Sequence, residues 1–309
     1  MDEMEIIMFK NELLKFYKGK KVFITGHTGF KGSWLSKILI EAGAIVKGYA
    51  LEPNTNPSLF ELLNIEKKMN STIGDVRNYD NLLKSMKEFS PEIIIHLSAQ
   101  PIVRESYKNP RYTYESNVMG TVNVLECVRN INTVKSCLII TTDKVYFNEE
   151  WDYGYRETDR LCGYDPYSNS KSCAELVYYS YYNSYFKENK NIAVSTARSG
   201  NVIAGGDFAQ DRIMTDAVNA FLNQSDIIVR NPYSIRPYQH VLDTLNGYLM
   251  LAKLQYENKN IEGSYNFGPN AESSVTTGEL VTMFCSKLDN QIKWIDRSDA
   301  NAVHESKFL

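Results

Sequence analysis

The fold is decided by the stretch Lys21-Val22-Phe23-Ile24-Thr25-Gly26-His27-Thr28-Gly29-Phe30-Lys31-Gly32. Its first five residues predict a strand, and residues 33–42 predict a helix that ends at Gly43. Residues 44–51 predict a second strand. A strand, a glycine-rich turn, a helix and another strand together predict a βαβ unit that binds a dinucleotide.

The glycine triplet Gly26, Gly29 and Gly32 has a physical purpose in such a unit. It allows a tight turn, close approach of the backbone to a pyrophosphate, and close packing of helix on strand. The helix start adds free N–H groups that attract an anion. The triplet alone could be an ordinary tight turn, but its place between a strand and a helix favours cofactor binding.

The same alternation continues to about residue 202 and predicts the fold class. We expect an α/β, Rossmann-like, doubly wound parallel sheet with helices on both faces. After residue 202 the rhythm breaks, so we expect a cofactor domain over 1–202 and a smaller, interleaved substrate-binding lobe over 203–309, with part of 235–268 joining the sheet. The further strands are predicted at 71–77, 92–97, 137–142, 192–197, 227–229, 235–241 and 264–267, and the further helices at 8–18, 79–89, 112–130, 166–186, 214–223 and 244–255.

Composition excludes several classes of function. The net charge of -3 argues against nucleic acid as a partner. The five cysteines are widely spaced without a C-x-x-C pair, which predicts reduced thiols, no disulfide frame and no metal site. Acidic residues before any apolar run argue against a signal peptide, and no apolar stretch reaches membrane-spanning length. We therefore expect a cytoplasmic protein.

The cofactor is expected to be NAD. Glu52, just after the second strand, is the acidic residue nearest to where the adenosine ribose would bind. No arginine lies between residues 50 and 65 to pair a 2′-phosphate, so NAD is favoured over NADP. Asp75, after the third strand, could accept from the adenine amino group or could simply cap a helix.

Three reactive side chains end the fifth strand. The apolar run Cys137-Leu138-Ile139-Ile140 leads into Thr142, Asp143 and Lys144. Such residues can be a plain turn, but ligands bind at the carboxyl ends of parallel strands. Alternation puts Thr142 and Lys144 on one face and Asp143 on the other. All three can reach one ligand only if the strand ends or twists at Asp143.

Tyr167 and Lys171 are the second candidate pair. Asp165-Pro166 predicts a helix start, and residues four apart share one helix face. An ammonium beside a phenol lowers the pKa of the phenol, which makes Tyr167 a candidate general base. A solvated helix face would show the same spacing, but the nucleotide turn upstream favours the catalytic interpretation.

With these motifs, the chain resembles the extended short-chain dehydrogenase/reductase family. The similar segments are Gly26-x-x-Gly29-x-x-Gly32, Asp75-Val76-Arg77, His96-Leu97-Ser98-Ala99-Gln100, Tyr167-x-x-x-Lys171 and Tyr265-Asn266-Phe267-Gly268. Within it, Thr142-Asp143-Lys144 resembles the nucleotide-sugar 4,6-dehydratases, and the lysine, together with the residues around 26–35, 198–207 and 235–241, resembles the branch that acts on CDP-glucose. C4-epimerases usually carry serines and an alanine at the fifth strand instead.

The resemblance implies a redox-neutral reaction with bound NAD. Tyr167, helped by Lys171 and Thr142, would act at C4 of the sugar, Lys144 would remove the C5 proton, and Asp143 would protonate the C6 hydroxyl. Lys144 can be a base only if its pKa is lowered. The implied contacts with the cofactor are made by Gly26, Thr28, Gly29, Phe30, Gly32, Asp75, Val76, Leu97, Ala99, Tyr167 and Lys171, and those with the nucleotide-sugar by Gln100, Arg104, Asn201, Arg212 and Arg236.

The resemblance also implies a homodimer paired through the helices at 112–130 and 166–186, and a place in deoxysugar biosynthesis for lipopolysaccharide O-antigen. Similar proteins usually continue beyond residue 309, so the lobe is expected to be short at its C-terminus. Two alternatives stay open: another nucleotide-sugar dehydratase or a C4-epimerase, and an NAD-binding protein without catalytic activity.

Overall fold

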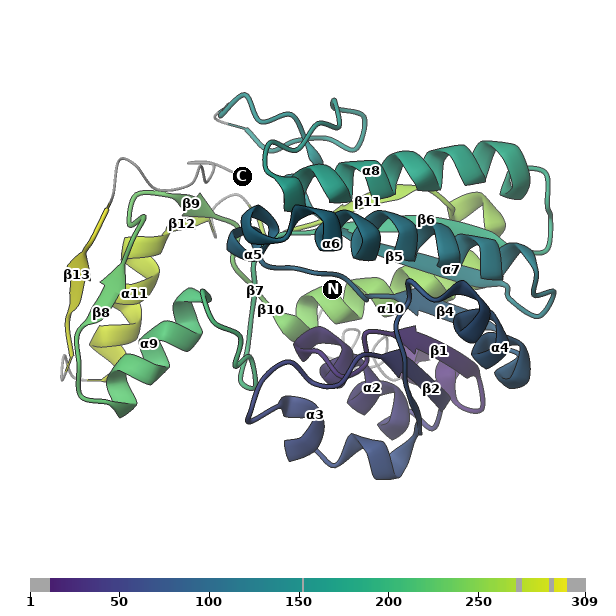
Figure 1. Cartoon of the computed structure of the whole chain (residues 1–309), viewed down its shortest axis with the longest axis horizontal. Helices are drawn as coiled ribbons and strands as arrows, with labels where there is room; N and C mark the ends of the chain where they lie inside the picture. Colours follow the sequence, from purple (N-terminus) through teal and green to yellow (C-terminus); the bar gives the residue numbers. More distant parts are fainter. Residues whose placement is uncertain (1–11, 152, 271–273, 289–291, 299–309) are drawn as a thin grey trace.

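A computed structural model of the chain describes residues 12–151, 153–270, 274–288 and 292–298. Its centre is a seven-stranded sheet in which every neighbouring pair is parallel, in the order β11-β6-β5-β4-β1-β2-β3 (Figure 1). The strands are β1 (Lys21–Thr25), β2 (Ile45–Ala50), β3 (Asn70–Ile73), β4 (Ile93–His96), β5 (Ser136–Thr142), β6 (Ala193–Ser199) and β11 (Ser264–Phe267). The predicted doubly wound parallel sheet is confirmed.

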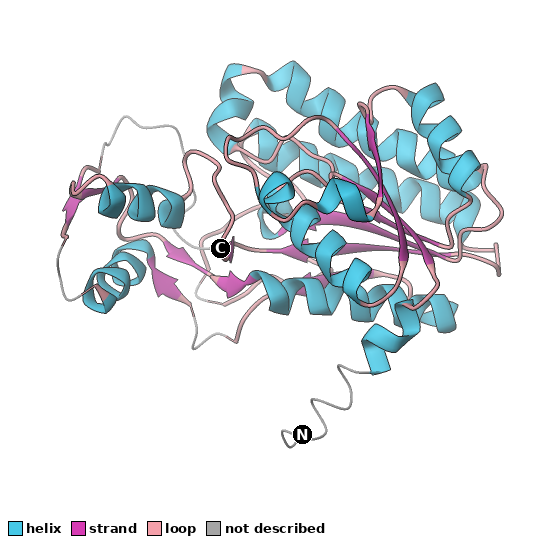
Figure 2. Ribbon diagram, turned by 90° about the horizontal axis from the view of Figure 1, so that it is seen from below, coloured by secondary structure: helices cyan, strands magenta, loops and turns pink. Residues whose placement is uncertain are grey.

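Helices cover both faces of this sheet (Figure 2). On one face α2 (Phe30–Glu41) and α10 (Val241–Glu257) place Leu35, Leu39, Leu245 and Leu249 against the strands. On the other face α4 (Tyr79–Phe89), α7 (Gly120–Arg129) and α8 (Pro166–Tyr181) contribute Leu82, Val124 and Tyr178. Strands β4, β5 and β6 are buried along their whole length, which explains the apolar runs in β4 and β5.

A smaller lobe lies beyond the carboxyl ends of the strands (Figure 1). Its helices α9 (Ile213–Leu222) and α11 (Thr277–Lys287) pack on the parallel pair β8 (Ile227–Val229) and β13 (Trp294–Asp296) around a core that includes Ala217, Ile227 and Val281. Short strand pairs lead toward it: β7 (Val202–Ile203) with β10 (Gln239–His240), and β9 (Ile235–Arg236) with β12 (Val275–Thr276). The boundary at residue 202 stays a prediction.

Several details differ from the predicted elements, among them the third strand, which was predicted at 71–77 and ends at Ile73. The helix predicted at 112–130 begins earlier, as α6 (Pro110–Tyr114), and passes through a π-helical turn (Glu115–Met119) before α7. A short helix, α5 (Val103–Lys108), precedes it. The run at 235–241 is divided between β9 and β10, and α11, β12 and β13 were not predicted. Residues 12–17 are helical, whereas the start of the helix predicted at 8–18 lies outside the described residues.

No helix within the described ranges is both long enough and apolar enough to cross a membrane.

Candidate active site

Strand β5 ends at the residue where the reactive groups begin. Thr142 is the last residue of the strand, and Asp143–Val145 form a 3-10 turn. The Thr142 hydroxyl caps this turn by accepting from the Lys144 N–H at 3.4 Å, and it donates to Asp143 Oδ1 at 2.9 Å. Lys144 Nζ lies 3.5 Å from the same carboxylate oxygen. Because the turn replaces the strand at Asp143, the two-residue alternation ends there and the three side chains lie at one site.

Helix α8 begins opposite this turn. Asp165 is its N-cap, accepting from the Ser168 N–H at 3.0 Å, and Pro166 is its first residue. This places Tyr167 in the first turn, where its phenol forms a hydrogen bond with the Thr142 side chain. The tip of β5 and the start of α8 therefore meet through Thr142 and Tyr167.

The phenol of Tyr167 is not activated in the way that the sequence predicted. Burial raises its pKa to about 12, against the contact with the Thr142 side chain and the charge of Arg212, which lower it. Lys171 Nζ donates instead to the Ile140 carbonyl at 3.0 Å, and burial lowers the pKa of this lysine to about 8. The predicted lowering of the Tyr167 pKa is therefore wrong for the protein without ligands, since burial outweighs the nearby cations.

The pKa of Lys144 is lowered from its ordinary value, in the direction that a base needs. Burial lowers its pKa; the Asp143 carboxylate opposes this effect, and the charges of Arg236 and Arg212 add to it. Its side chain still keeps 22% of its surface exposed, so a ligand can reach it.

A further, partly buried lysine, which sequence reasoning missed, lies in the same site. Lys31 Nζ donates to Ser199 Oγ at 2.9 Å, and the Tyr248 hydroxyl donates to the same oxygen at 2.7 Å. Burial and the charge of Arg212 lower the pKa of Lys31 to about 7. The available signal was a lysine inside the glycine-rich turn, where a charged side chain has to find a partner.

The glycine-rich turn has the shape that a pyrophosphate needs. Gly26 has φ +79°, and a Cβ on Gly32 would lie 2.0 Å from the Gly26 carbonyl oxygen, so both positions require glycine. A Cβ on Gly29 would meet only the Gly26 oxygen, at 3.5 Å, among the described residues, which leaves the space above the start of α2 open. Gly29 is the N-cap of α2 and brings no side-chain cap of its own, so the first N–H groups of the helix stay available to an anion. These features fit a bound dinucleotide.

The other predicted cofactor contacts lie along the same edge of the sheet. Thr28 donates to the Leu51 carbonyl at 2.8 Å, and Phe30 opens α2. Leu97 and Ala99 follow β4, and Val76 is buried beside Asp75. The Asp75 carboxylate binds Arg77, with Oδ2 accepting from Nη2 at 2.6 Å and from Nε at 2.9 Å, and it does not cap α4, whose N-cap is Asn78.

Five residues were predicted to contact the substrate. Three of them, Gln100, Arg104 and Asn201, already contact other parts of the protein. Gln100 is turned into the protein: its amide contacts Ile102 and Thr113, so the structure does not support a role in lining the sugar site. Arg104 lies 3.9 Å from Asp211, in the loop before α9. Asn201 precedes β7, and its carbonyl accepts from the Gln239 N–H at 3.0 Å.

Arg212 and Arg236 lie closest to the reactive groups, since their charges act on Lys144. Arg236 is buried and donates to the Ile235 carbonyl at 3.0 Å. Within the described part of the chain, Arg212 Nε and Asp143 Oδ2 are buried without a hydrogen-bond partner. Unpaired buried donors and acceptors are uncommon in proteins, and a polar ligand at this site would supply partners for these two atoms.

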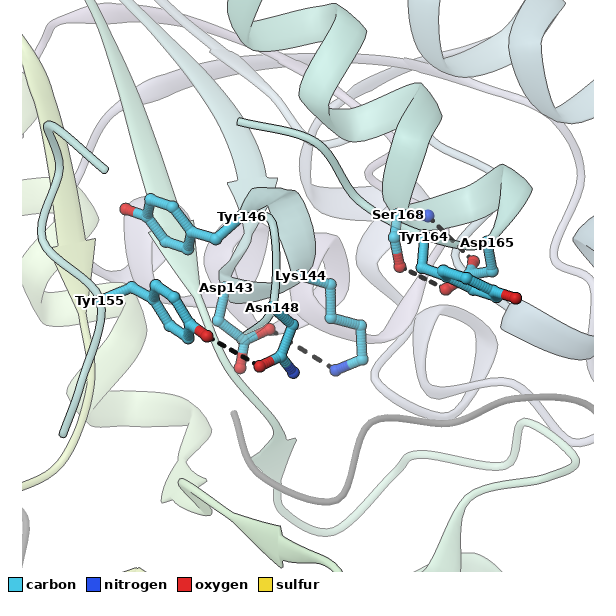
Figure 3. A pocket seen from close by; sticks show the side chains of 8 residues that line it. All are labelled: Asp143, Lys144, Tyr146, Asn148, Tyr155, Tyr164, Asp165 and Ser168. Carbon is cyan, nitrogen blue, oxygen red and sulfur yellow. Dashed lines mark hydrogen bonds and ion pairs between the residues drawn. The ribbon is translucent and has the colours of Figure 1, made fainter. Parts of the chain in front are cut away.

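A small pocket opens between the turn and α8 (Figure 3). It is lined by Asp143, Lys144, Tyr146, Asn148, Tyr155, Tyr164, Asp165 and Ser168. Lys144 extends between the stacked rings of Tyr146 and Tyr155 on one side and Tyr164 on the other. No cluster of three or more histidine, cysteine or carboxylate side chains suited to a metal ion occurs among the described residues.

Comparison with known proteins assigns the chain to a family. A sequence model described as GDP-mannose 4,6 dehydratase matches residues 23–307. The chain belongs to the GDP-mannose 4,6-dehydratase family.

Members and relatives of this family carry different activities. The chain is 48% identical, over 299 residues, to a CDP-glucose 4,6-dehydratase of Salmonella typhimurium, covering 95% of this chain and 83% of that protein. It is 24% identical to a UDP-glucose 4-epimerase of Pisum sativum, over 86% of this chain and 80% of that one. Among solved structures, the dTDP-glucose 4,6-dehydratase DesIV of Streptomyces venezuelae, with NAD bound, shares the fold with a TM-score of 0.75 at 20% identity, covering 90% of this chain and 85% of that one.

Proposed function

We propose that this protein is an NAD-dependent nucleotide-sugar 4,6-dehydratase and that its substrate is CDP-glucose. The observation that carries the proposal is the meeting of Thr142, Asp143 and Lys144 with Tyr167 at the end of β5. This site offers one group for C4, one base for C5 and one acid for C6. The 48% identity to a CDP-glucose 4,6-dehydratase supports the choice of sugar nucleotide.

The residues divide the reaction among them. The glycine-rich turn at Gly26, Gly29 and Gly32 would hold NAD, which would supply the acceptor for hydride from C4 and the source of hydride for C6. Thr142 holds the C4 hydroxyl and Tyr167 removes its proton, which leaves a ketone at C4. The ketone acidifies C5, where Lys144 removes the proton while Asp143 protonates the C6 hydroxyl, and water leaves. Lys144 then returns a proton to C5, and the proton that Tyr167 took at C4 replaces the one that Asp143 gave at C6. The overall reaction therefore removes one water and changes no net oxidation state.

Cations hold the diphosphate in this proposal. Arg236 and Arg212 face the reactive groups from the smaller lobe, and an arginine pairs a phosphate through two parallel hydrogen bonds. The unpaired Nε of Arg212 gives it a donor for this purpose. The diphosphate would reduce the positive charge that Lys31, Lys144, Arg212 and Arg236 build up around Asp143.

A product assay tests the proposal directly. Incubation with CDP-glucose and NAD in deuterated buffer should give a 4-keto-6-deoxy sugar that carries deuterium at C5. Parallel reactions with dTDP-glucose, GDP-mannose and UDP-glucose measure which nucleotide base the enzyme prefers in its substrate. Unchanged CDP-glucose with folded, NAD-binding protein would count against the proposal.

A C4-epimerase is the second candidate, favoured by the similarity to the UDP-glucose 4-epimerase. It would invert C4 and leave C5 without deuterium, so the same experiment separates the two.

The proposal extends to the assembly and the compartment. The helices expected to pair with their copies in a second subunit lie at 112–130 and 166–186. Their exposed apolar and aromatic side chains, among them Met119, Leu176 and Tyr179, support a homodimer. All five cysteines are free thiols, which supports a cytoplasmic location.

A further inference from the structure

A buried ion pair lies between β6 and α8, beneath the turn that carries Lys144. Arg198 Nη2 is 2.7 Å from Glu175 Oε2, and the two side chains are only 3% and 1% exposed. Glu175 also accepts from Thr196 Oγ1 at 2.8 Å and from Thr141. The reaction proposed above gives Arg198 and Glu175 no task. A pair so far from water is costly to bury, and it holds its geometry only through such additional hydrogen bonds.

The second arm of the Arg198 fork reaches the catalytic turn. Its Nη1 donates to the Tyr146 hydroxyl at 2.7 Å and to the Glu157 carbonyl at 3.1 Å. Tyr146 is buried, comes directly after the turn and stands two residues from Lys144. Its side chain points away from Lys144, toward Tyr155 (Figure 3). The Arg198 guanidinium therefore links Glu175 on α8 to Tyr146, the residue directly after the turn.

The same tyrosine is held from two more sides. Its hydroxyl donates to Asn266 Oδ1 at 2.7 Å, on the edge strand β11. Its ring stacks on Tyr155, with centroids 5.2 Å apart and planes 12° apart. Asn266 in turn donates to the Tyr155 carbonyl at 2.8 Å. The wall of the pocket and the turn are thus fastened to a single buried polar network around Arg198.

We propose that Arg198 is a positioning residue for the dehydration step: through Tyr146 it fixes the turn that presents Lys144 and Asp143 to C5 and C6 of the sugar. This inference rests on the proposed function. The planar fork of an arginine can hold Glu175 and Tyr146 at the same time, whereas the point charge of a lysine cannot reproduce that geometry. A shift of about 1 Å in a reacting group can cost about a hundredfold in rate.

The test uses two substitutions that keep the charge of the replaced side chain and change its size little. Tyr146→Phe removes only the hydroxyl that Arg198 and Asn266 bind, and Arg198→Lys keeps the charge beside Glu175. Each should lower the rate of product formation by about 10- to 100-fold while KM changes less than about threefold. Because C4 oxidation does not need the turn to be fixed, absorbance of reduced nicotinamide should appear on mixing and decay slowly.

Tyr178→Phe is the matched control. Tyr178 is also buried between α8 and β6, and its hydroxyl donates to the Val194 carbonyl at 3.1 Å, away from the turn. This variant loses the same kind of hydrogen bond and should keep wild-type turnover. Equal losses of turnover in Tyr146→Phe and Tyr178→Phe, with equal losses of thermal stability, would overturn the proposal.

A measurement without substrate separates this inference from the proposed function. Labelling of Lys144 by acetic anhydride, followed by mass spectrometry as a function of pH, reports where its amine becomes reactive. Asp143, Arg212 and Arg236 face this amine. In Tyr146→Phe and Arg198→Lys the turn should open to water, so the midpoint of labelling should rise toward that of ordinary lysines. An unchanged midpoint overturns the inference, and a shifted midpoint in a protein that turns over no sugar nucleotide supports it while refuting the proposed function.

Discussion

At the scale of single residues, the site separates two proton transfers that a simple dehydrogenase does not need to separate. Tyr167 is buried against Thr142 with a raised pKa, whereas Lys144 has a lowered one. The first group needs a nearby cation, such as the oxidised nicotinamide ring, to lose its proton, and the lowered pKa of the second favours its neutral form. Opposite shifts in one site keep the two proposed bases distinct, with Tyr167 acting at C4 and Lys144 at C5.

Two substitutions should therefore stop the reaction at different stages. Tyr167→Phe should lower C4 oxidation by about 10³-fold, since it removes the base for that proton. Lys144→Ala should leave the reduction of NAD intact and block loss of water. Rapid mixing with CDP-glucose, followed by the absorbance of reduced nicotinamide and by product analysis, distinguishes the two. If Lys144→Ala abolishes both stages equally, Lys144 has a structural role instead.

Lys31 predicts a dependence of stability on pH. Its pKa is about 7 in the folded protein, below the ordinary lysine value of 10.5, so between these values the unfolded chain binds more protons. The contribution of Lys31 to the free energy of unfolding therefore rises with pH across that range. This stability is lost as the pH falls toward 7. Replacing Lys31 with methionine should make the unfolding free energy less dependent on pH between 7 and 10, measured by urea unfolding at several pH values. An unchanged slope would show that the pKa of Lys31 is not lowered in the folded protein.

At the scale of elements, the sequence was most informative where local pattern and burial agree. The strands at 21–25, 227–229 and 264–267 and the helix at 79–89 have the predicted bounds. Their limits follow from apolar runs and from cap residues such as Asn78, which are local signals. The sequence also indicated that β5 must end or twist at Asp143, because only then can Thr142, Asp143 and Lys144 reach the same ligand.

The sequence failed where tertiary contacts decide the local conformation. The π-helical turn at 115–119 places Asn117 inside, where its amide binds both backbone groups of Gln100 at 2.8 and 3.1 Å and Ser170 Oγ at 2.8 Å. No spacing in a single sequence marks such a turn, since its stabilising partners lie 17 and 53 residues away. The same holds for Lys31, whose partner Ser199 is 168 residues away.

The connection after β6 gives a prediction at this scale. A Cβ on Gly200 would lie 2.8 Å from Asp143 Oδ2 and 2.7 Å from Pro237 Cγ. Because the proline ring is rigid, Gly200→Ala should displace the carboxylate and lower kcat by about 10- to 100-fold with little change in thermal stability. Gly205→Ala is the control, since a Cβ there meets nothing within 4 Å in the described structure. Wild-type kcat in Gly200→Ala would show that the carboxylate position is not critical.

At the scale of the whole molecule, one unpartnered surface predicts the assembly. Leu176 and Tyr179 on α8 are 53% and 66% exposed, and Met119, in the π-helical turn that leads into the neighbouring helix α7, is 49% exposed. Leu176→Arg should convert a dimer into a monomer, because two copies of the charge would meet across a two-fold axis. Sedimentation of the variant and the wild type would show the change, and the exposed Leu254→Arg on α10 is a control outside this surface. A wild type that sediments as a monomer contradicts the prediction.

The position of β11 has a consequence for biosynthesis. β6 pairs on its outer side with residues 264–267, and α10 covers one sheet face only after residue 257. A ribosome that has released the first 202 residues has therefore released a sheet whose β6 edge is open and whose one face is covered by α2 but not yet by α10. Asn266, which accepts from the Tyr146 hydroxyl, is still to come. The nascent protein has to wait for the rest of the chain before its catalytic half can close, which makes this interval the stage at which chaperone binding matters most.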